Sequence, residues 1–234
     1  MRKLLASLFL IITLGTTQGA NAGPLEDGQA AWSRGDYATA LSMWRPLADQ
    51  GNANAQCNLG NMYKDGKDVV KDHKKIAKLY RLAVDQGNAS AQNSLGFMYA
   101  RGQGVPKDYK EAVKWYRLAA AQGYALAQFN LGLQYDKGQG VVQDHKEAVK
   151  WYQLAADQGD AVAQYALGLC YGAGQGVAQD DVRAHMWFLL SVSNGYSAAS
   201  KFRDIAAKRL TAAQIAQAQE IARRCQASSY QQCD

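Results

Sequence analysis

Histidine and aspartate side chains are the first groups in this sequence that could support metal or acid–base chemistry. There are three histidines. His73 and His145 open matching segments far apart in the chain, so we do not expect them to share a metal ion. Asp181 and His185 are one helical turn apart and could pair, but one such pair is usually a surface hydrogen bond. We therefore predict no metal site and no catalytic residue.

Glycine-rich turns are the second feature that could carry chemistry, because some Gly-x-Gly loops bind phosphate. Here they begin at Gly102, Gly138 and Gly174. No strand is predicted before them, and the Lys-Ser or Lys-Thr pair of a phosphate-binding loop is absent. We interpret them as tight turns that use the left-handed conformations open to glycine, and we expect no cofactor.

These turns belong to a repeat of 36 residues that organises most of the chain. Glycines recur on this period, as do Leu-Gly pairs; they are Gly51, Gly87, Gly123, Gly159 and Gly195, and Leu59-Gly60, Leu95-Gly96, Leu131-Gly132 and Leu167-Gly168. A fixed period of this length indicates a solenoid, in which no single unit buries a core alone. Function is therefore to be sought on the surface of stacked units.

Each unit carries the signals of two helices. An aspartate precedes each second apolar run, where its side chain can cap a helix N-terminus; these are Asp72, Asp108, Asp144 and Asp180. A tyrosine follows each Leu-Gly leucine by four residues, on the same helix face; these are Tyr63, Tyr99, Tyr135 and Tyr171. Ala112, Trp115, Tyr116 and Ala119 make one apolar stripe on the second helix. Each unit is thus predicted to be a helical hairpin.

The full pattern, A-x-A-Q-x-x-L-G-x-x-Y-x-x-G-x-G-V-x-x-D-x-x-x-A-x-x-W-Y-x-x-A-A-x-Q-G, resembles the Sel-one-like repeat family, which is related to tetratricopeptide repeats. The resemblance implies an all-α, right-handed superhelical solenoid of antiparallel helix pairs. It also implies an adaptor or scaffold whose first helices line the concave side. Copy one departs from the pattern because Asp68 replaces the second loop glycine. We expect that loop to survive, since aspartate tolerates left-handed geometry.

Residues 1–22 have the features of a signal peptide. Arg2 and Lys3 precede the apolar segment Leu4 to Leu14, and Ala20-Asn21-Ala22 resembles a cleavage site. We predict export to the periplasm or beyond the cell; an uncleaved anchor is disfavoured by the short apolar segment. Losing the leader lowers the net charge from +6 to about +4, too modest to indicate a nucleic-acid partner.

Four parts follow from these patterns. Residues 1–22 are the signal peptide, and 23–50 are a divergent N-terminal capping hairpin around Gly35-Asp36-Tyr37. Residues 51–195 hold four repeats, and 196–234 hold C-terminal capping helices and a tail. Thr211 and Gln214 form a capping box that predicts a helix through about Arg224.

The cysteines fall into two groups. Cys225 and Cys233 are close in sequence, and in an exported protein we predict a disulfide that fixes the tail to the last helix. Cys57 and Cys170 lie in copies one and four. Each stacked unit between them adds roughly 10 Å, so they are beyond disulfide reach. We expect them to be partly buried thiols.

The resemblance to tetratricopeptide stacks also implies which residues line the concave groove. They flank the Leu-Gly pairs, and the candidates are Asn61, Asp65, Asn93, Phe97, Arg101, Phe129, Leu133, Lys137, Tyr165 and Leu169, with Cys57 and Ala173 at equivalent positions. The groove is then polar at its N-terminal end and aromatic at its C-terminal end, where we place a binding hot spot. The alternative is that Phe97, Phe129 and Tyr165 only pack between helices.

We predict a non-catalytic, exported scaffold that binds a protein or peptide in its concave groove. One alternative is a weak cell-wall-directed hydrolase, since some proteins that this chain resembles are linked with β-lactam binding. That activity calls for a Ser-x-x-Lys nucleophile, and no serine after residue 22 has lysine three residues on. The other alternative is a structural protein that assembles end to end.

Overall fold

The computed structural model describes residues 23–230 and 233, which contain twelve α-helices and no strand. The predicted signal peptide lies outside the described residues. The helices are α1 (Pro24–Ser33), α2 (Tyr37–Asp49), α3 (Ala53–Asp65), α4 (His73–Val84), α5 (Ala89–Arg101), α6 (Tyr109–Ala121), α7 (Ala125–Lys137), α8 (His145–Ala156), α9 (Ala161–Ala173), α10 (Asp181–Ser193), α11 (Ala199–Ala207) and α12 (Ala212–Ala227). None of the described helices is long and apolar enough to cross a membrane.

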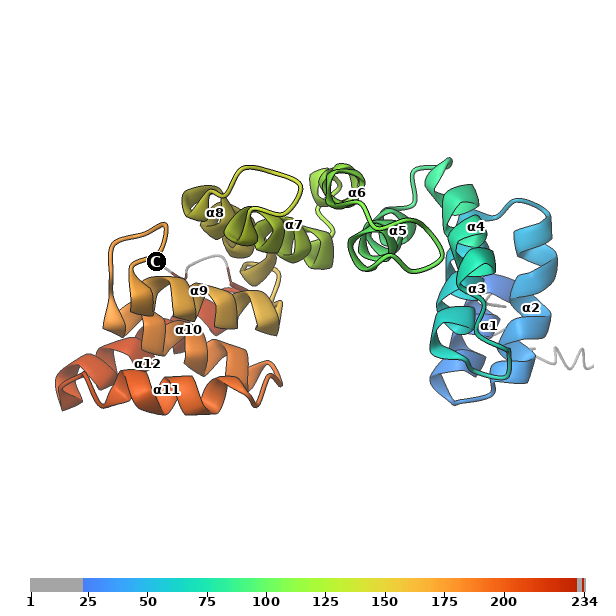
Figure 1. The fold of residues 1–234 in the computed structure, drawn as a ribbon. Coiled ribbons are helices and arrows are strands. Elements are labelled where there is room, and N and C mark those ends of the chain that lie inside the picture. Colours follow the sequence, from blue (N-terminus) through green and yellow to red (C-terminus); the bar gives the residue numbers. More distant parts are fainter. Residues whose placement is uncertain (1–22, 231–232, 234) are drawn as a thin grey trace, which may run out of the picture.

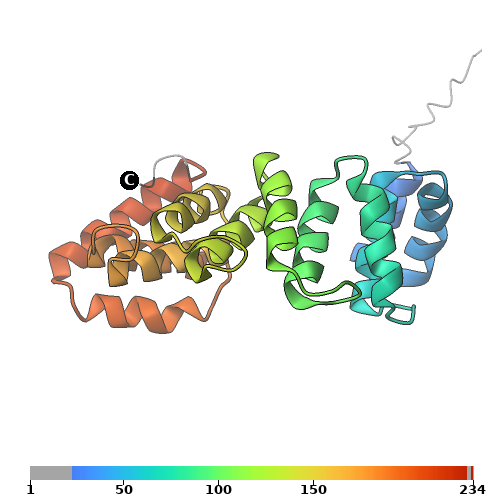
Figure 2. The same ribbon diagram turned by 45° about the horizontal axis from the view of Figure 1, so that its top comes forward.

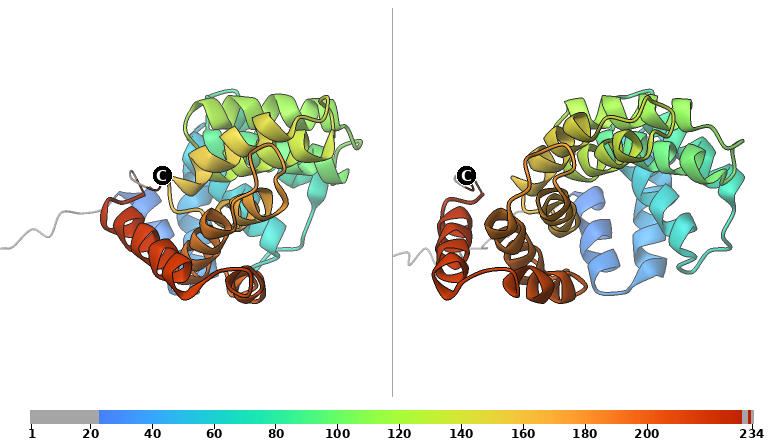
Figure 3. Two further views of the ribbon diagram at one scale, coloured as in Figure 1. Left: turned by 90° about the vertical axis from the view of Figure 1, so that its left-hand side faces the viewer. Right: turned by 60° about the vertical axis from the view of Figure 1, so that its left-hand side comes forward.

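Consecutive helices pair and the pairs stack into an open array. Within a repeat the first helix packs on the second, as α5 does on α6, and each second helix packs on the next first helix. Figure 1 shows an arch with α1 and α2 at one end and α11 and α12 at the other. The view of Figure 2 keeps the two ends apart, and Figure 3 shows from two sides how the pairs turn along the array. The predicted all-α solenoid is confirmed.

Aspartates and glycines set the helix ends, as the repeat pattern predicts. The Asp72 side chain accepts hydrogen bonds from the backbone N–H groups of Lys74 and Lys75 at the start of α4. Gly102 ends α5 in the left-handed region, with φ of 69°. Asp68, which replaces a loop glycine in copy one, also has positive φ, at 52°. The turn of copy one therefore keeps its geometry without the glycine.

The Leu-Gly pair brings the two helices of a repeat into close contact. Leu131 is fully buried, and the ring of Tyr152, 2% exposed, lies directly against Gly132. A Cβ atom on Gly132 would stand 2.8 Å from the Tyr152 ring and 3.1 Å from the backbone oxygen of Ala148. The glycine is therefore required by the close approach of the second helix.

A ladder of amide hydrogen bonds joins the end of each repeat, where the glutamine is exposed, to a buried glutamine near its beginning. Gln122 Nε2 donates to Gln92 Oε1 at 2.8 Å, and Gln158 Nε2 donates to Gln128 Oε1 at 2.7 Å. Gln128 Nε2 in turn donates to the backbone oxygen of Ala120 in the preceding second helix, at 3.4 Å. Because buried amides are costly when unpaired, the ladder specifies how the repeats stack.

The C-terminal helices extend the stack and then cover its side. α11 takes the place of the next first helix, since Ala199 and Ala206 pack with Phe188 of α10. α12 begins with the predicted Thr211–Gln214 capping box and packs along α10 as well. α10 is thus in contact with three helices, α9, α11 and α12.

His185 lies inside this end of the stack and does not pair with Asp181. Its Nδ1 is 3.0 Å from the backbone oxygen of Arg203, while Asp181 Oδ1 accepts from Arg209 at 3.3 Å. Burial lowers the pKa of His185 below its usual value, and the hydrogen bond to the Arg203 backbone offsets only part of this effect. The helical spacing of Asp181 and His185 therefore does not form a functional pair.

The buried histidine predicts loss of stability in mild acid. Because the folded pKa of His185 is lowered, the unfolded chain binds more protons below pH ~6.5, where an unfolded histidine titrates. The contribution of the neutral His185 to the free energy of unfolding is fully present above that pH, and it is lost as the pH drops below it. We expect the urea midpoint to fall between about pH 7.5 and about pH 5.5 and to fall less in His185→Gln. The half-buried His145, changed to glutamine, is the control; an unchanged pH profile in His185→Gln would contradict the assignment.

Candidate partner-binding groove

A cavity of about 600 Å³ opens on the side of the array formed by the first helices of copies one to three. It extends from the N-terminal hairpin α1–α2, past α3 and α5, to α7. The volume lies in the range typical of specific binding sites. The repeats and the N-terminal cap build this groove together.

Uncharged side chains dominate the wall of the cavity. The amides and hydroxyls are Gln29, Asn58, Asn61, Ser90, Asn93, Ser94, Gln103 and Asn130, and the larger rings are Trp32, Trp44, Tyr80, Phe97 and Tyr124. Among the lining residues the full charges are Lys64 and Asp65, whose side chains lie 3.9 Å apart. The cavity is therefore suited to an uncharged segment rich in hydrogen-bonding groups.

Hydrogen bonds hold the asparagines in fixed positions. Tyr80 Oη donates to Asn61 Oδ1 at 2.7 Å, and Asn130 Nδ2 donates to Asn93 Oδ1 at 2.9 Å. Both carbonyl oxygens are thus used within the protein, which leaves the amide N–H groups of Asn93 as its free donors. Burial raises the pKa of Tyr80 well above its usual range, so this tyrosine stays a neutral donor.

Four of the ten residues predicted to line the groove lie in the cavity wall. They are Asn61, Asp65, Asn93 and Phe97. Phe97 is 38% exposed, and the Arg101 guanidinium stands over its ring at 5.4 Å from the centroid. Arg101 therefore lies beside the cavity, next to one of its exposed rings.

The other five predicted residues, in copies three and four, lie outside this cavity. Phe129 packs on Tyr152, with ring centroids 5.7 Å apart. Tyr165 belongs to a cluster with Phe188, Tyr196 and Phe202, at centroid distances of 5.2 to 5.8 Å. Leu133 is half-buried, and Lys137 and Leu169 are exposed on the same helices. The aromatic end of the groove is thus used largely for packing, and the open cavity is at the polar end.

Several cavity residues did not follow from the repeat positions used for the sequence prediction. Gln29, Trp32 and Trp44 come from the N-terminal hairpin, whose place beside the groove has no signal in the repeat pattern. Asn58 and Asn130 are one residue before the Leu-Gly pairs of copies one and three, where the chain also has Ser94 and Ala166. The residue at this position is polar in copies one to three and is alanine in copy four. This difference between the copies is the signal in the sequence that points to the cavity.

The remaining candidate chemical groups lie apart from one another. His73 is in the cavity wall, and His145 Nδ1 is 2.9 Å from Asp136 Oδ1 on another part of the array. Within residues 23–230 and Cys233 there is no group of three or more side chains that could hold a metal ion. Cys225 and Cys233 form a disulfide with Cα atoms 4.5 Å apart, and Cys57 and Cys170 are buried free thiols.

Comparisons with known proteins agree with this architecture. A family model described as Sel1 repeat matches residues 53–88, 89–124, 125–160 and 161–196. A protective antigen of uropathogenic Escherichia coli strains, with an SLR fold, is similar over 88% of this chain at 33% identity and TM-score 0.80. This chain spans only 46% of that protein.

Two further solved structures are similar to the chain. A Sel1 repeat protein from Oxalobacter formigenes is 36% identical over 78% of this chain and 74% of its own, with TM-score 0.72. An immunity protein from Pseudomonas aeruginosa shares the fold over 75% of this chain and 66% of its own, at 24% identity and TM-score 0.53. No match was found among curated proteins.

Proposed function

The chain belongs to the Sel1 repeat family, whose members are typically protein-interaction scaffolds, and we propose that it is an exported adaptor that binds a protein or peptide in its concave groove without catalysis. The observation that carries this proposal is the cavity lined by α1 to α5 and α7. Asn61 and Asn93 in its wall are held by hydrogen bonds from Tyr80 and Asn130 before any partner binds. Preorganisation of this kind lowers the cost of binding.

The chemistry of the cavity favours an extended, uncharged segment of a partner. The Asn93 amide N–H groups can donate to main-chain carbonyl oxygens, and Phe97 and Trp32 provide apolar surface for side chains. Lys64 and Asp65 offset each other, so neither end of the cavity attracts a strongly charged ligand. Recognition would depend on main-chain hydrogen bonds and aromatic contacts.

Export is the second part of the proposal. The first 22 residues have the composition of a signal peptide, and the Cys225–Cys233 disulfide is typical of oxidising compartments. The relative that is a protective antigen supports a location accessible from outside the cell. We place the protein in the periplasm or outside the cell.

Two matched variants test where the groove binds. Phe97 and Leu169 occupy the same repeat position, and they are 38% and 37% exposed, but only Phe97 lies in the cavity. We expect Phe97→Ser to reduce recovery of the partner from an envelope extract at least about tenfold, because the loss of an interface hot spot costs at least ~1.4 kcal/mol. Leu169→Ser should leave recovery unchanged.

The opposite result for the two variants would place the binding site in another part of the groove. Loss of recovery in Leu169→Ser alone would place binding at the C-terminal end of the groove, as the sequence predicted. If both variants are shown by circular dichroism to be folded and both recover the partner as well as wild type does, binding in the groove is contradicted.

A further inference from the structure

A second surface is formed by one stripe on each of the second helices α4, α6 and α8. Each stripe has two lysines and a leucine at successive helical turns; they are Lys74, Lys78 and Leu82, then Lys110, Lys114 and Leu118, then Lys146, Lys150 and Leu154. The three leucines are 41%, 45% and 46% exposed. We call these residues, with Arg81 and Arg117 beside them, the outer stripes.

The fourth second helix shows what such a stripe does when it is covered. On α10 the equivalent positions are Val182, Met186 and Leu190, and both Met186 and Leu190 are 0% exposed. α12 lies along them and contributes Ala218 and Ala222 to the same core cluster. This face of the repeat therefore accepts a helix, and on α10 it carries apolar residues in place of lysines.

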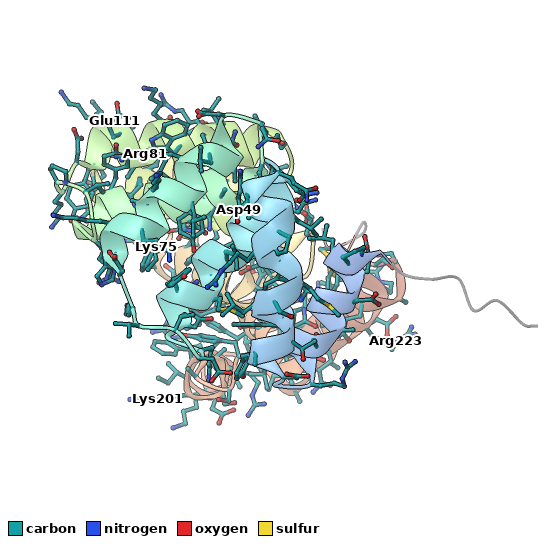
Figure 4. All side chains as sticks on the ribbon, turned by 90° about the vertical axis from the view of Figure 1, so that its right-hand side faces the viewer. Asp49, Lys75, Arg81, Glu111, Lys201 and Arg223 are labelled. Carbon is teal, nitrogen blue, oxygen red and sulfur yellow. A yellow bond between two sulfur atoms is a disulfide. The ribbon has the colours of Figure 1, made fainter. Side chains whose placement is uncertain are left out.

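Positive charge exceeds negative charge on the three helices that carry the outer stripes. α4 has four lysine and arginine residues and no acidic residue. α6 and α8 each have one glutamate, and these pair with Lys114 at 3.4 Å and with Lys150 at 2.9 Å. Arg117 is held in place because its guanidinium donates to Tyr135 Oη at 2.8 Å. Figure 4 shows Arg81 and Glu111 on one side of the molecule, away from Lys201 of α11. A ligand of the outer stripes must therefore supply negative charge.

Two open hollows lie beside the exposed leucines. One, of about 490 Å³, has Val113, Leu118 and Gly140 at its apolar part and Lys110, Lys114 and Arg117 at its edge. The other, of about 650 Å³, lies beside Leu154 and has Lys150 and Arg183 at its edge. Each hollow offers open apolar surface bordered by positive charge, which suits apolar side chains with carboxylates on either side.

We propose that the outer stripes bind an acidic amphipathic helix of a partner protein, which places apolar side chains against the leucines and Asp or Glu side chains against the lysines. The helix of the partner would cover this face as α12 covers α10 in the same chain. The site is distinct from the concave cavity, so the protein would hold two partners at once. The adaptor would then bring two partner proteins together.

Two other occupants fit the surface less well. A flat anionic membrane would meet the stripes together only if they shared a plane, but the helix pairs turn along the array (Figure 3). The α12 helix of a second copy is also unsuited, because its outward charges include Arg223 and Arg224. The experiment below tests the membrane with vesicles, and a mass in solution that grows with concentration would instead indicate a second copy.

The test is a display library of helical peptides as long as α12, with leucines on one face and flanking positions varied among Glu, Gln and Lys, selected on the full chain. We expect enrichment of Glu over Lys. The selected peptide should bind Leu118→Ser and Arg117→Glu at least about tenfold more weakly, and wild type more weakly in high salt. Ile205→Ser and Lys201→Glu, on the exposed side of α11, are the controls and should bind as wild type does.

Three results of the selection and binding measurements would overturn the proposal, and a fourth would come from the groove variant. They are no enrichment of Glu, binding that is insensitive to Leu118→Ser, and binding to vesicles of phosphatidylglycerol and phosphatidylethanolamine in preference to the peptides. Loss of peptide binding in Phe97→Ser would instead assign the selected peptides to the concave groove, and would also contradict it. Binding at the groove can fail independently, since Phe97 is in neither hollow.

Discussion

Replacing Gly132 with alanine should lower the free energy of unfolding by about 2 kcal/mol, although alanine is the better helix former by about 1 kcal/mol. The new Cβ would stand 2.8 Å from the Tyr152 ring, which is itself 2% exposed and has little space in which to move. It would also stand 3.1 Å from a backbone oxygen of α8, which no side-chain rotation can relieve. The close contact between α7 and α8 would therefore open.

Gly172 is the matched control for this substitution. It also lies in a first helix, α9, but a Cβ there would meet only the Ala184 side chain, at an ordinary 3.7 Å. We expect Gly172→Ala to raise stability by about 0.5 kcal/mol, because it removes the entropy cost of glycine in a helix. Urea unfolding followed by circular dichroism measures both. If the two variants shifted stability in the same direction, close packing at Gly132 would not explain the Leu-Gly pair.

The repeat fold could be predicted because its signals are local and recur in phase. Capping aspartates, left-handed glycines and Leu-Gly pairs each fix a turn or a contact within one hairpin, and four copies confirm one another. The sequence did not show that the amide ladder joins the end of each repeat to its beginning, although its Gln residues are part of the repeat pattern. The pairing of the buried Gln92 with the exposed Gln122 is recognised only when the fold brings together residues that are 30 apart.

The candidate groove could be predicted only in part. The resemblance implied the first helices of the repeats, and Asn61, Asn93 and Phe97 on two of them line the cavity. Exposed and packed rings at equivalent positions cannot be told apart by spacing, however, because Tyr165 is covered by Phe202 of α11, which lies outside the repeats. Neighbours from the two ends of the chain thus decide which part of the groove is open.

The course of α12 had a signal in the sequence that is clear in retrospect. The lysines of the outer stripes are replaced in copy four by Val182 and Met186, and Arg81 is matched by Leu189. Such a loss of charge at solvent positions indicates that another element covers the helix. The sequence contains the substitution, but it does not say which segment covers it.

Removing the disulfide with Cys225→Ser and Cys233→Ser is expected to lower the free energy of unfolding by about 2.5 kcal/mol. A disulfide across a sequence separation of eight residues reduces the conformational entropy of the unfolded chain, and this stabilises the folded state by roughly that amount. In the folded protein it also holds Tyr230, whose Oη donates to Asn194 Oδ1 at 2.7 Å. Asn194 Nδ2 donates to Gln164 Oε1 at 2.9 Å, so the tail is tied to the last step of the amide ladder.

Loss of the bridge should therefore loosen α12 before the repeats, because Tyr230 and Cys233 pack in the core cluster that α12 completes. Hydrogen exchange should become faster at Ala218 and Ala222, and α10 should expose Leu190, while α3 to α6 keep their protection. Reducing agent should have the same effect on wild type and none on the double variant. Burial raises the pKa of the Cys57 thiol, and that of Cys170 to about 12, so neither supplies the thiolate needed to exchange with the bridge. Unchanged protection in α12 after reduction would mean that packing on α10 alone holds the helix, and the outer face of a repeat would then bind a helix without covalent support.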